Sequence, residues 1–142
     1  MAKDKALTGA AGAYYIAFWL SVEGYAVGLT TYGTRSIDLI VANPDTGKSI
    51  TIQAKTMRNA LVHSRKEGDY WNWRVGKSLH PAYETFFYTF VGMKDNPSDT
   101  PKVFIMPSKE LTSLLSFFPE GVAPDSADVK DVWCVIYEKD WP

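Results

Sequence analysis

The sequence predicts an α/β fold in which a central sheet is flanked by helices. An uncharged apolar run at residues 6–22 has the length of a helix, two short runs rich in Ile and Val follow it, and further apolar runs alternate with polar segments up to residue 137. Helices and strands mixed in this way normally pack as layers around one core. With 142 residues, 46 % of them hydrophobic, and no repeat or low-complexity linker, residues 1–142 are expected to form a single domain.

The first element is expected to be a helix over Ala6–Val22. Gly24 lies just beyond it, where a left-handed residue ends many helices. The run is shorter than the roughly 20 residues of a membrane-spanning helix, so we expect neither a membrane span nor a signal peptide. Because the run is apolar nearly all round, we expect this helix to be buried between other elements.

Cysteine and histidine are scarce in this chain. One cysteine, Cys134, cannot form an internal disulfide, and with only two histidines a Cys/His zinc site is excluded. A reducing cytoplasm is the simplest location for such a protein. The formal net charge of −1 by itself predicts no partner.

The strongest strand signals form a hairpin. Ile37–Ala42 and Ser49–Thr56 are rich in Ile and Val and are separated by a typical turn sequence, Asn-Pro-Asp-Thr-Gly-Lys. A strand at Tyr25–Leu29 is expected before them. The elements expected after them are strands at Thr85–Val91 and Lys102–Met106, a helix that starts at Pro107-Ser-Lys-Glu with Ser108 as N-cap and runs through Phe117, and a strand at Val132–Tyr137 that closes the sheet.

The segment Met57–Ala82 lacks a clean periodicity and is expected to be a long functional loop or an irregular extension. It is basic and contains an aromatic cluster, which suits a surface where cations neutralise phosphates and rings stack on bases. Aromatic residues at alternating positions can equally form a lid over the core, and both alternatives stay open. The candidate nucleic-acid-binding residues are Arg58, Arg65, Lys66, Trp71, Trp73, Arg74 and Lys77.

Alternation along the hairpin brings three polar side chains together. If the two strands pair directly across their turn, Asp38 lies opposite Gln53 and Ser36 lies opposite Lys55. Opposed side chains of an antiparallel pair have Cβ atoms roughly 5 Å apart. Asp38, Gln53 and Lys55 are therefore expected to share one small patch.

This trio suits phosphodiester chemistry. The Asp38 carboxylate, the Gln53 amide oxygen and the Ala54 backbone carbonyl are hard oxygen ligands of the kind that Mg²⁺ or Mn²⁺ prefers. A lysine beside the metal can orient a bound water and offset charge on the phosphate. The alternative is a solvated cross-strand ion pair between Asp38 and Lys55, which needs no function to explain it.

These segments resemble the PD-(D/E)xK nuclease superfamily. The resemblance lies in a helix carrying Gly9-x-x-Gly12, a strand Ser36-Ile-Asp38-Leu-Ile40, and a strand that ends in Gln53-Ala-Lys55-Thr56. The Gln-x-Lys form is similar to restriction-endonuclease-like and Holliday-junction-resolvase-like members. The match covers residues 6–56 and, more loosely, residues 103–111. It implies a restriction-endonuclease-like mixed central sheet, a divalent Mg or Mn cofactor, DNA as partner and a homodimer as one arrangement.

Carried over residue by residue, the resemblance makes Asp38 a metal ligand, Gln53 the residue at the Glu or Gln position, and Lys55 the catalytic lysine. It implies a Mg-dependent DNA endonuclease. Two departures bear on activity. Ala13 stands where the superfamily often has a glutamate on the first helix, and Gln53 is neutral.

With Asp38 as the only side-chain carboxylate, metal affinity is expected to be low. The missing ligands would come from the substrate phosphate or from Glu67 or Asp69, or else the site has lost its activity. The alternative function is therefore a catalytically impaired protein of this fold that serves as a nucleic-acid-binding or accessory interaction module.

Overall fold

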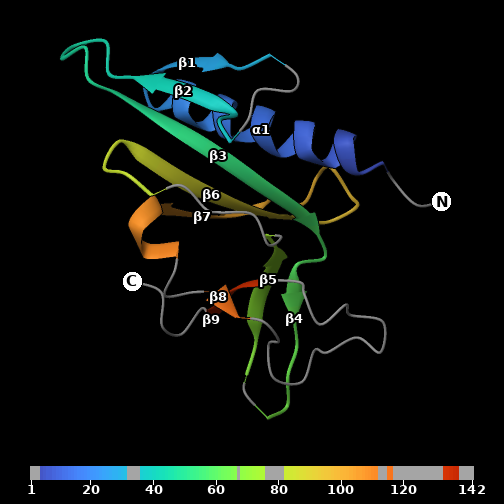
Figure 1. The fold of residues 1–142 in the computed structure, drawn as a ribbon. Helices are drawn as coiled ribbons and strands as arrows, with labels where there is room; N and C mark the ends of the chain where they lie inside the picture. Colours follow the sequence, from blue (N-terminus) through green and yellow to red (C-terminus); the bar gives the residue numbers. More distant parts are fainter. Residues whose placement is uncertain are drawn as a thin grey trace.

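The computed structural model describes residues 4–31, 36–66, 68–75, 82–111, 115–116 and 133–137. Five strands form a mixed sheet in the order β1-β2-β3-β6-β7, and four strands form a second sheet in the order β4-β5-β9-β8 (Figure 1). The elements in chain order are α1 (Lys5–Val22), β1 (Ala26–Leu29), β2 (Leu39–Ala42), β3 (Ser49–Arg58), β4 (Leu61–Val62), β5 (Tyr70–Arg74), β6 (Phe86–Met93), β7 (Lys102–Pro107), the 3-10 turn η1 (Ser108–Glu110), β8 (Leu115–Ser116) and β9 (Trp133–Tyr137).

The five-stranded sheet confirms the α/β class and the predicted hairpin. β2 and β3 are antiparallel, with Ala42 opposite Ser49 and Leu39 opposite Ile52. β3 and β6 are parallel, and such a pair requires a crossover of a dozen residues or more. Here the crossover carries β4 and β5 of the second sheet. The sheet is mixed because β3–β6 is parallel whereas its other pairs are antiparallel.

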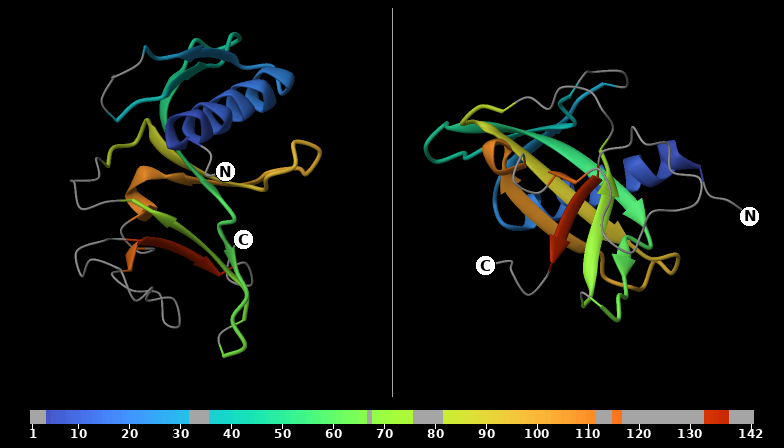
Figure 2. Two further views of the ribbon diagram at one scale, coloured as in Figure 1. Left: turned by 90° about the vertical axis from the view of Figure 1, so that its right-hand side faces the viewer. Right: turned by 60° about the horizontal axis from the view of Figure 1, so that its bottom comes forward.

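Among the described residues, α1 is the one helix that flanks this sheet. α1 covers one face, and the second sheet lies on the other (Figure 2). Residues along β6 alternate accordingly: Phe86, Tyr88 and Phe90 pack toward the second sheet, whereas Phe87 and Val91 pack toward α1. The strand predicted at Val132–Tyr137 exists as β9, but it pairs with β5 and not with the central sheet.

Both ends of α1 follow standard capping chemistry. The Asp4 side chain accepts a hydrogen bond from the Ala6 backbone N–H at 2.6 Å. At the other end, Gly24 adopts φ +97°, its N–H donates to Ser21 O, and the Tyr25 N–H donates to Leu20 O. These two bonds form a Schellman motif, which satisfies carbonyls that the helix leaves without partners. Among the described residues, no helix has both the length and the hydrophobicity that crossing a bilayer demands.

The expectation that α1 is buried on all sides is wrong. Only one face packs on the sheet, through Thr8, Gly12, Ile16 and Leu20. On the opposite face, four large apolar side chains are 62–69 % exposed: Leu7, Tyr14, Phe18 and Val22.

The closest approach of α1 to the sheet is at Gly12. A Cβ atom added there would lie 2.7 Å from the Cβ of Thr56 on β3 and closer still to its hydroxyl oxygen. Gly9, one turn earlier on the same helix, has nothing within 4 Å of the corresponding position. Gly12 therefore sets the distance between the helix and the strand that carries Lys55.

Gly9→Ala and Gly12→Ala should change stability in opposite directions. Both substitutions improve helix propensity, so Gly9→Ala should raise the free energy of unfolding by about 0.5–1 kcal/mol. Gly12→Ala should instead lower it by about 1–3 kcal/mol, because the methyl group overpacks the contact with Thr56. Urea denaturation of both variants measures the difference, and equal stabilisation by the two would show that α1 does not pack as closely as described.

Two further expectations need correction. Met57–Ala82 is not a loop in its described part: β3 extends to Arg58, and β4 and β5 form a hairpin. The helix expected from Ser108 through Phe117 begins with the turn η1 and a helical Leu111, residues 112–114 and 117 lie outside the described residues, and Leu115–Ser116 is a strand and not part of a helix. Ser108 does not cap a helix, because its hydroxyl accepts from the Tyr83 N–H at 2.9 Å and donates to the Tyr83 carbonyl at 2.8 Å.

Candidate functional site

The site predicted on the hairpin lies where β2 and β3 separate. β2 pairs with β3 only as far as Leu39 and Ile52. β3 continues to Arg58 with β6 on its other side. In the part of the chain that the structure describes, no strand pairs with β3 beyond Ile52 on the β2 side. This gap exposes one backbone edge of β3 to the side chain of Asp38.

The Asp38 carboxylate continues the hydrogen-bonding pattern of the sheet. The backbone N–H of Asp38 donates to the Ile52 carbonyl at 2.8 Å. The side-chain Oδ2 of Asp38 accepts from the Ala54 N–H, also at 2.8 Å. The Thr30 N–H donates to the Asp38 carbonyl at 3.0 Å. The half-buried carboxylate is thus fixed at the end of β2, in the place where the next acceptor of that strand would lie.

The predicted pairing of Ser36 with Lys55 does not occur. Ser36 has a left-handed backbone with φ 64°, and β2 begins only at Leu39. An extended strand cannot pass through such a residue, so the chain turns away from β3 before it could place Ser36 opposite Lys55.

Asp38 lines a cavity of about 430 Å³ between α1 and the hairpin. Ala13 lines the same cavity, so the helix position at which the resemblance expects a glutamate opens onto the cavity of Asp38. It contributes a methyl group and no carboxylate. The lining residues besides these two are Ala6, Gly9, Ala10, Tyr14, Leu29, Thr30, Thr31 and Ala54.

Three oxygen atoms near the end of β2 have the chemistry of magnesium ligands. Asp38 Oδ1 accepts no hydrogen bond from the described residues, since only Oδ2 is bonded. The N–H and C=O of one strand residue face the same neighbour, so the Ala54 carbonyl faces the Asp38 side as its N–H does. The pairing of Gln53 with Asp38 predicted from the sequence is not part of the register, which ends at Leu39 and Ile52; Gln53 is half-buried on β3, between Ile52 and Ala54. One carboxylate with two neutral oxygens fits an ion that keeps waters and takes further ligands from phosphate.

No additional carboxylate reaches this site from the described residues. Asp69 is on the β4–β5 connection, where its Oδ2 lies 3.1 Å from His63 Nδ1. Glu67 lies outside the described residues. The described residues contain no group of three or more His, Cys, Asp or Glu side chains that could hold a metal ion. Among the described residues, Asp38 is thus the only acidic side chain at the end of β2.

Lys55 lies next to Ala54 on β3 and is half-buried. Burial lowers the pKa of its ammonium below the ordinary value of 10.5, and the nearby Asp38 carboxylate partly opposes this by raising it. Lys55 makes no hydrogen bond or ion pair with the described residues. A surface ion pair with Asp38 is therefore not what holds it, and its ammonium is available to an anion.

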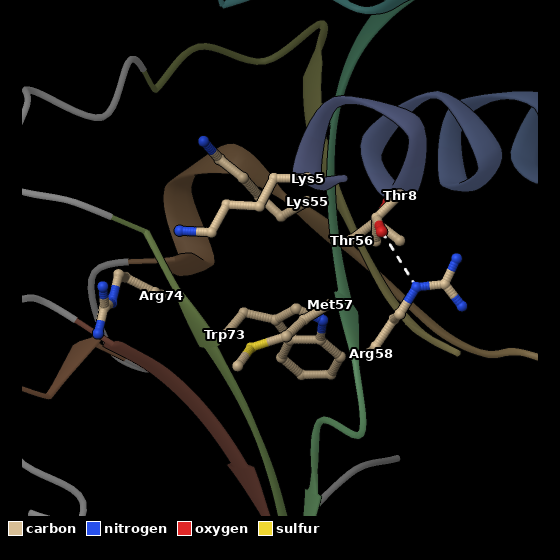
Figure 3. Close-up of a pocket in the computed structure, with 8 residues that line it drawn as sticks. All are labelled: Lys5, Thr8, Lys55, Thr56, Met57, Arg58, Trp73 and Arg74. Atoms are coloured by element: carbon tan, nitrogen blue, oxygen red, sulfur yellow. Dashed lines mark hydrogen bonds between the residues drawn. The ribbon is translucent and has the colours of Figure 1, made fainter. Parts of the chain in front are cut away.

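Lys55 opens onto a second cavity, of about 480 Å³, that is rich in positive charge (Figure 3). Among the described residues that line it, four are cationic and none is acidic. Figure 3 shows Lys5, Lys55 and Arg74 extending toward one side of the cavity, with the ring of Trp73 below. The described lining consists of Lys5, Thr8, Lys55, Thr56, Met57, Arg58, Trp73 and Arg74.

Arg58 occupies the opposite side of this cavity and is anchored there. Its Nε donates to Thr8 Oγ1 at 3.1 Å, and its Nη1 lies 3.4 Å from the Lys94 carbonyl and 3.5 Å from Asp95 Oδ1. The Asp95 carboxylate offsets part of its charge. Arg58 therefore fixes one wall, whereas Lys5 and Lys55 present ammonium groups.

The structure gathers only some of the predicted nucleic-acid-binding residues. Arg58, Trp73 and Arg74 line the cavity with Lys55. Three others do not line it: Arg65 and Lys66 are exposed on the β4–β5 connection, and Trp71 is half-buried in a stack with Trp73. Lys77 lies outside the described residues.

Trp73 is only 1 % exposed, and its Nε1 donates to the Val91 carbonyl at 3.0 Å. Its ring cannot stack on a base without opening the core. For Trp73, the two alternatives left open by the sequence resolve in favour of the core.

Sequence reasoning missed Lys5 and Thr8. Both lie on the face of α1 that carries Gly12, at spacings of seven and four residues, and Thr8 and Gly12 are buried. A helical pattern extended backward from Gly12 would have placed Lys5 at the sheet side of the helix end.

Comparisons with protein-family models, with curated proteins and with solved structures gave no match. Function must therefore be inferred from the two cavities and from the residues that resemble the nuclease superfamily.

Proposed function

We propose that the protein binds DNA through the cavity lined by Lys5, Lys55 and Arg74 and hydrolyses a phosphodiester bond beside Asp38. The observation that carries this proposal is the position of Lys55. It extends into a cavity lined by cations, is not engaged by other described residues, and lies close enough to the fixed Asp38 carboxylate to interact with it electrostatically. Surface ion pairs offer no reason for such an arrangement, whereas phosphate chemistry does.

Each residue has a defined role in this proposal. Lys5 and Arg74 hold the phosphate backbone by charge. The Lys55 ammonium donates a hydrogen bond to the phosphate oxygen on which negative charge develops, and its partial burial strengthens that interaction. Asp38, held by the Ala54 N–H, keeps one carboxylate oxygen directed toward the reacting group.

A Mg²⁺ or Mn²⁺ ion held by Asp38, the Gln53 amide and the Ala54 carbonyl would supply Lewis acidity and a more acidic bound water. One carboxylate holds such an ion weakly, so we expect metal and DNA to bind together rather than separately.

Asp38→Asn is the sharpest test of this function. Asparagine keeps an oxygen that can accept from the Ala54 N–H, so the end of β2 should be preserved while the charge is removed. We expect Mn²⁺ to bind the wild type in calorimetric titrations with a short DNA duplex, to bind it much less without DNA, and not to bind the variant. Cleavage of duplex, single-stranded or branched DNA should fall by roughly 100-fold or more in the variant.

Absence of cleavage of every DNA form by the wild type, in Mg²⁺ and in Mn²⁺, would contradict the proposal. Equal cleavage by the wild type and the Asn variant would also contradict it, because the activity would then lie elsewhere or in a contaminant.

A second candidate function is DNA binding without cleavage, as an accessory module. It is favoured by Ala13, which lines the cavity of Asp38 without contributing a carboxylate. This candidate expects DNA binding that does not change with Mn²⁺ or with Asp38→Asn but weakens in a Lys5→Gln variant. The same titrations therefore separate the two functions.

A further inference from the structure

The exposed face of α1 carries a straight apolar stripe. It consists of Leu7, Ala11, Tyr14, Phe18 and Val22, at spacings of 4, 3, 4 and 4 residues, which place them along one side of a helix. Each large member is 62–69 % exposed, and Ala11 is exposed too. In the left view of Figure 2, no other described helix or strand lies over the side of α1 that faces away from the sheet.

This stripe differs from the usual outer face of a surface helix. Such a face is normally charged or polar, but α1 carries no charged side chain between Lys5 and Glu23. The buried residues Thr8, Gly12, Ile16 and Leu20 lie on the opposite side, so the stripe contributes nothing to the contact with the sheet. Contiguous exposed apolar surface of this kind marks an interaction site.

We propose that the stripe is the interface of a homodimer in which the α1 helices of two copies pack antiparallel. When two copies of the stripe lie antiparallel, its large and small residues match each other across the contact. With the two-fold axis next to Tyr14, Leu7 of one copy lies opposite Val22 of the other. The small Ala11 lies opposite the large Phe18, so the ring has space. A two-fold interface requires this kind of self-complementary surface.

The size and charge of the stripe fit a second copy. The 18 residues of α1 make a helix about 27 Å long. Its exposed apolar groups present roughly 500 Å² per copy, or roughly 1,000 Å² for the pair, which is near the lower limit of specific interfaces. No charge is desolvated along the contact. The dimer is therefore expected to form, with an affinity that leaves monomer at low concentration.

Sedimentation equilibrium tests the interface at a series of protein concentrations. Wild type is expected to shift from monomer to dimer, whereas Phe18→Glu and Ala11→Glu should stay monomeric. Ala11→Glu is the more specific variant, because it removes no large apolar group and an exposed alanine contributes little to folding. Ile40→Glu is the matched control: Ile40 is 49 % exposed but is on the sheet, outside the stripe, and this variant should dimerise as the wild type does.

The antiparallel register can be tested by cysteine crosslinking. Tyr14→Cys places two thiols near the axis, within the Cα separation of about 4–7 Å that a disulfide requires. Leu7→Cys places them roughly 20 Å apart, so only the first should form a crosslinked dimer under mild oxidation. The native Cys134 is buried and should not compete.

Three results would overturn the proposal. They are a wild type that is monomeric at every concentration, a dimer that both stripe variants retain, and a monomer that binds lipid vesicles through Phe18, which would assign the stripe to a membrane surface. Crosslinking of Leu7→Cys as efficiently as Tyr14→Cys would exclude the antiparallel arrangement. None of these results depends on nuclease activity, so the dimer and the proposed function can fail separately.

Discussion

Trp73→Ala is expected to lower the free energy of unfolding by about 3–5 kcal/mol, the usual cost of deleting a buried tryptophan ring. The ring is 1 % exposed and packs against Phe90 and Phe104, with centroid distances of 5.2 Å and 5.7 Å. Its removal would leave a cavity between the two sheets and would leave the Val91 carbonyl without the Nε1 donor. Urea denaturation followed by circular dichroism measures the loss.

Two variants separate the contributions of the ring. Trp73→Phe keeps an aromatic ring but removes the N–H, so it should cost about 1–3 kcal/mol for an unsatisfied carbonyl and a smaller ring. Trp71→Ala, at the neighbouring half-buried position, should cost less than Trp73→Ala, because part of that ring is already in water. An undiminished stability of Trp73→Ala, combined with lost DNA binding, would instead support base stacking by this residue.

Local signals in the sequence predict the first half of the fold well. Residues 6–22 have helical length and a glycine stop, and the hairpin turn has strong turn chemistry, so α1 and the register of β2 with β3 follow from interactions between near neighbours. The position of Asp38 beside Ala54 depends on that register and was therefore predictable.

The second sheet could not be predicted in the same way. β5 pairs with β9, about 60 residues later in the chain, and short strands show little periodicity of their own. Whether Trp73 faces water or a core depends on that distant pairing. The exposed face of α1 could not be predicted from composition either. An apolar helix is expected to be buried, unless a surface outside the chain covers it.

The site shows the same division. Asp38, Gln53 and Lys55 could be proposed as candidates from the sequence because they lie on one predicted hairpin. Lys5 joins Lys55 only through the packing of α1 on β3 at Gly12, which is a tertiary contact. The left-handed Ser36, which breaks its expected pairing with Lys55, carries no sequence signal such as a glycine.

On the proposed function, Lys55→Met is expected to slow cleavage strongly and at the same time to stabilise the fold at pH 7. Loss of the ammonium that stabilises charge on the phosphate should reduce the rate by roughly 100-fold or more. Methionine has a similar length and no charge to desolvate, so it removes the burial cost that lowers the pKa of Lys55. Cleavage rates and urea denaturation curves of the two proteins measure both effects. Lys48→Met, at an exposed lysine in the turn of the same hairpin, is the control and should change neither.

The stability difference should also depend on pH in a defined direction. Because the pKa of Lys55 is lower in the folded protein than its ordinary value of 10.5, the unfolded chain binds more protons in the window between the folded pKa and 10.5. The free energy of unfolding of the wild type therefore rises with pH through this window, relative to that of Lys55→Met. The advantage of the Met variant should be largest at neutral pH and should shrink as the pH approaches 10.5. A Met variant that is less stable than wild type at pH 7 would mean that the ammonium is held by favourable contacts, as in a structural ion pair. A variant that is more stable but inactive would mean that the protein keeps a destabilising charge in the cavity because the reaction needs it.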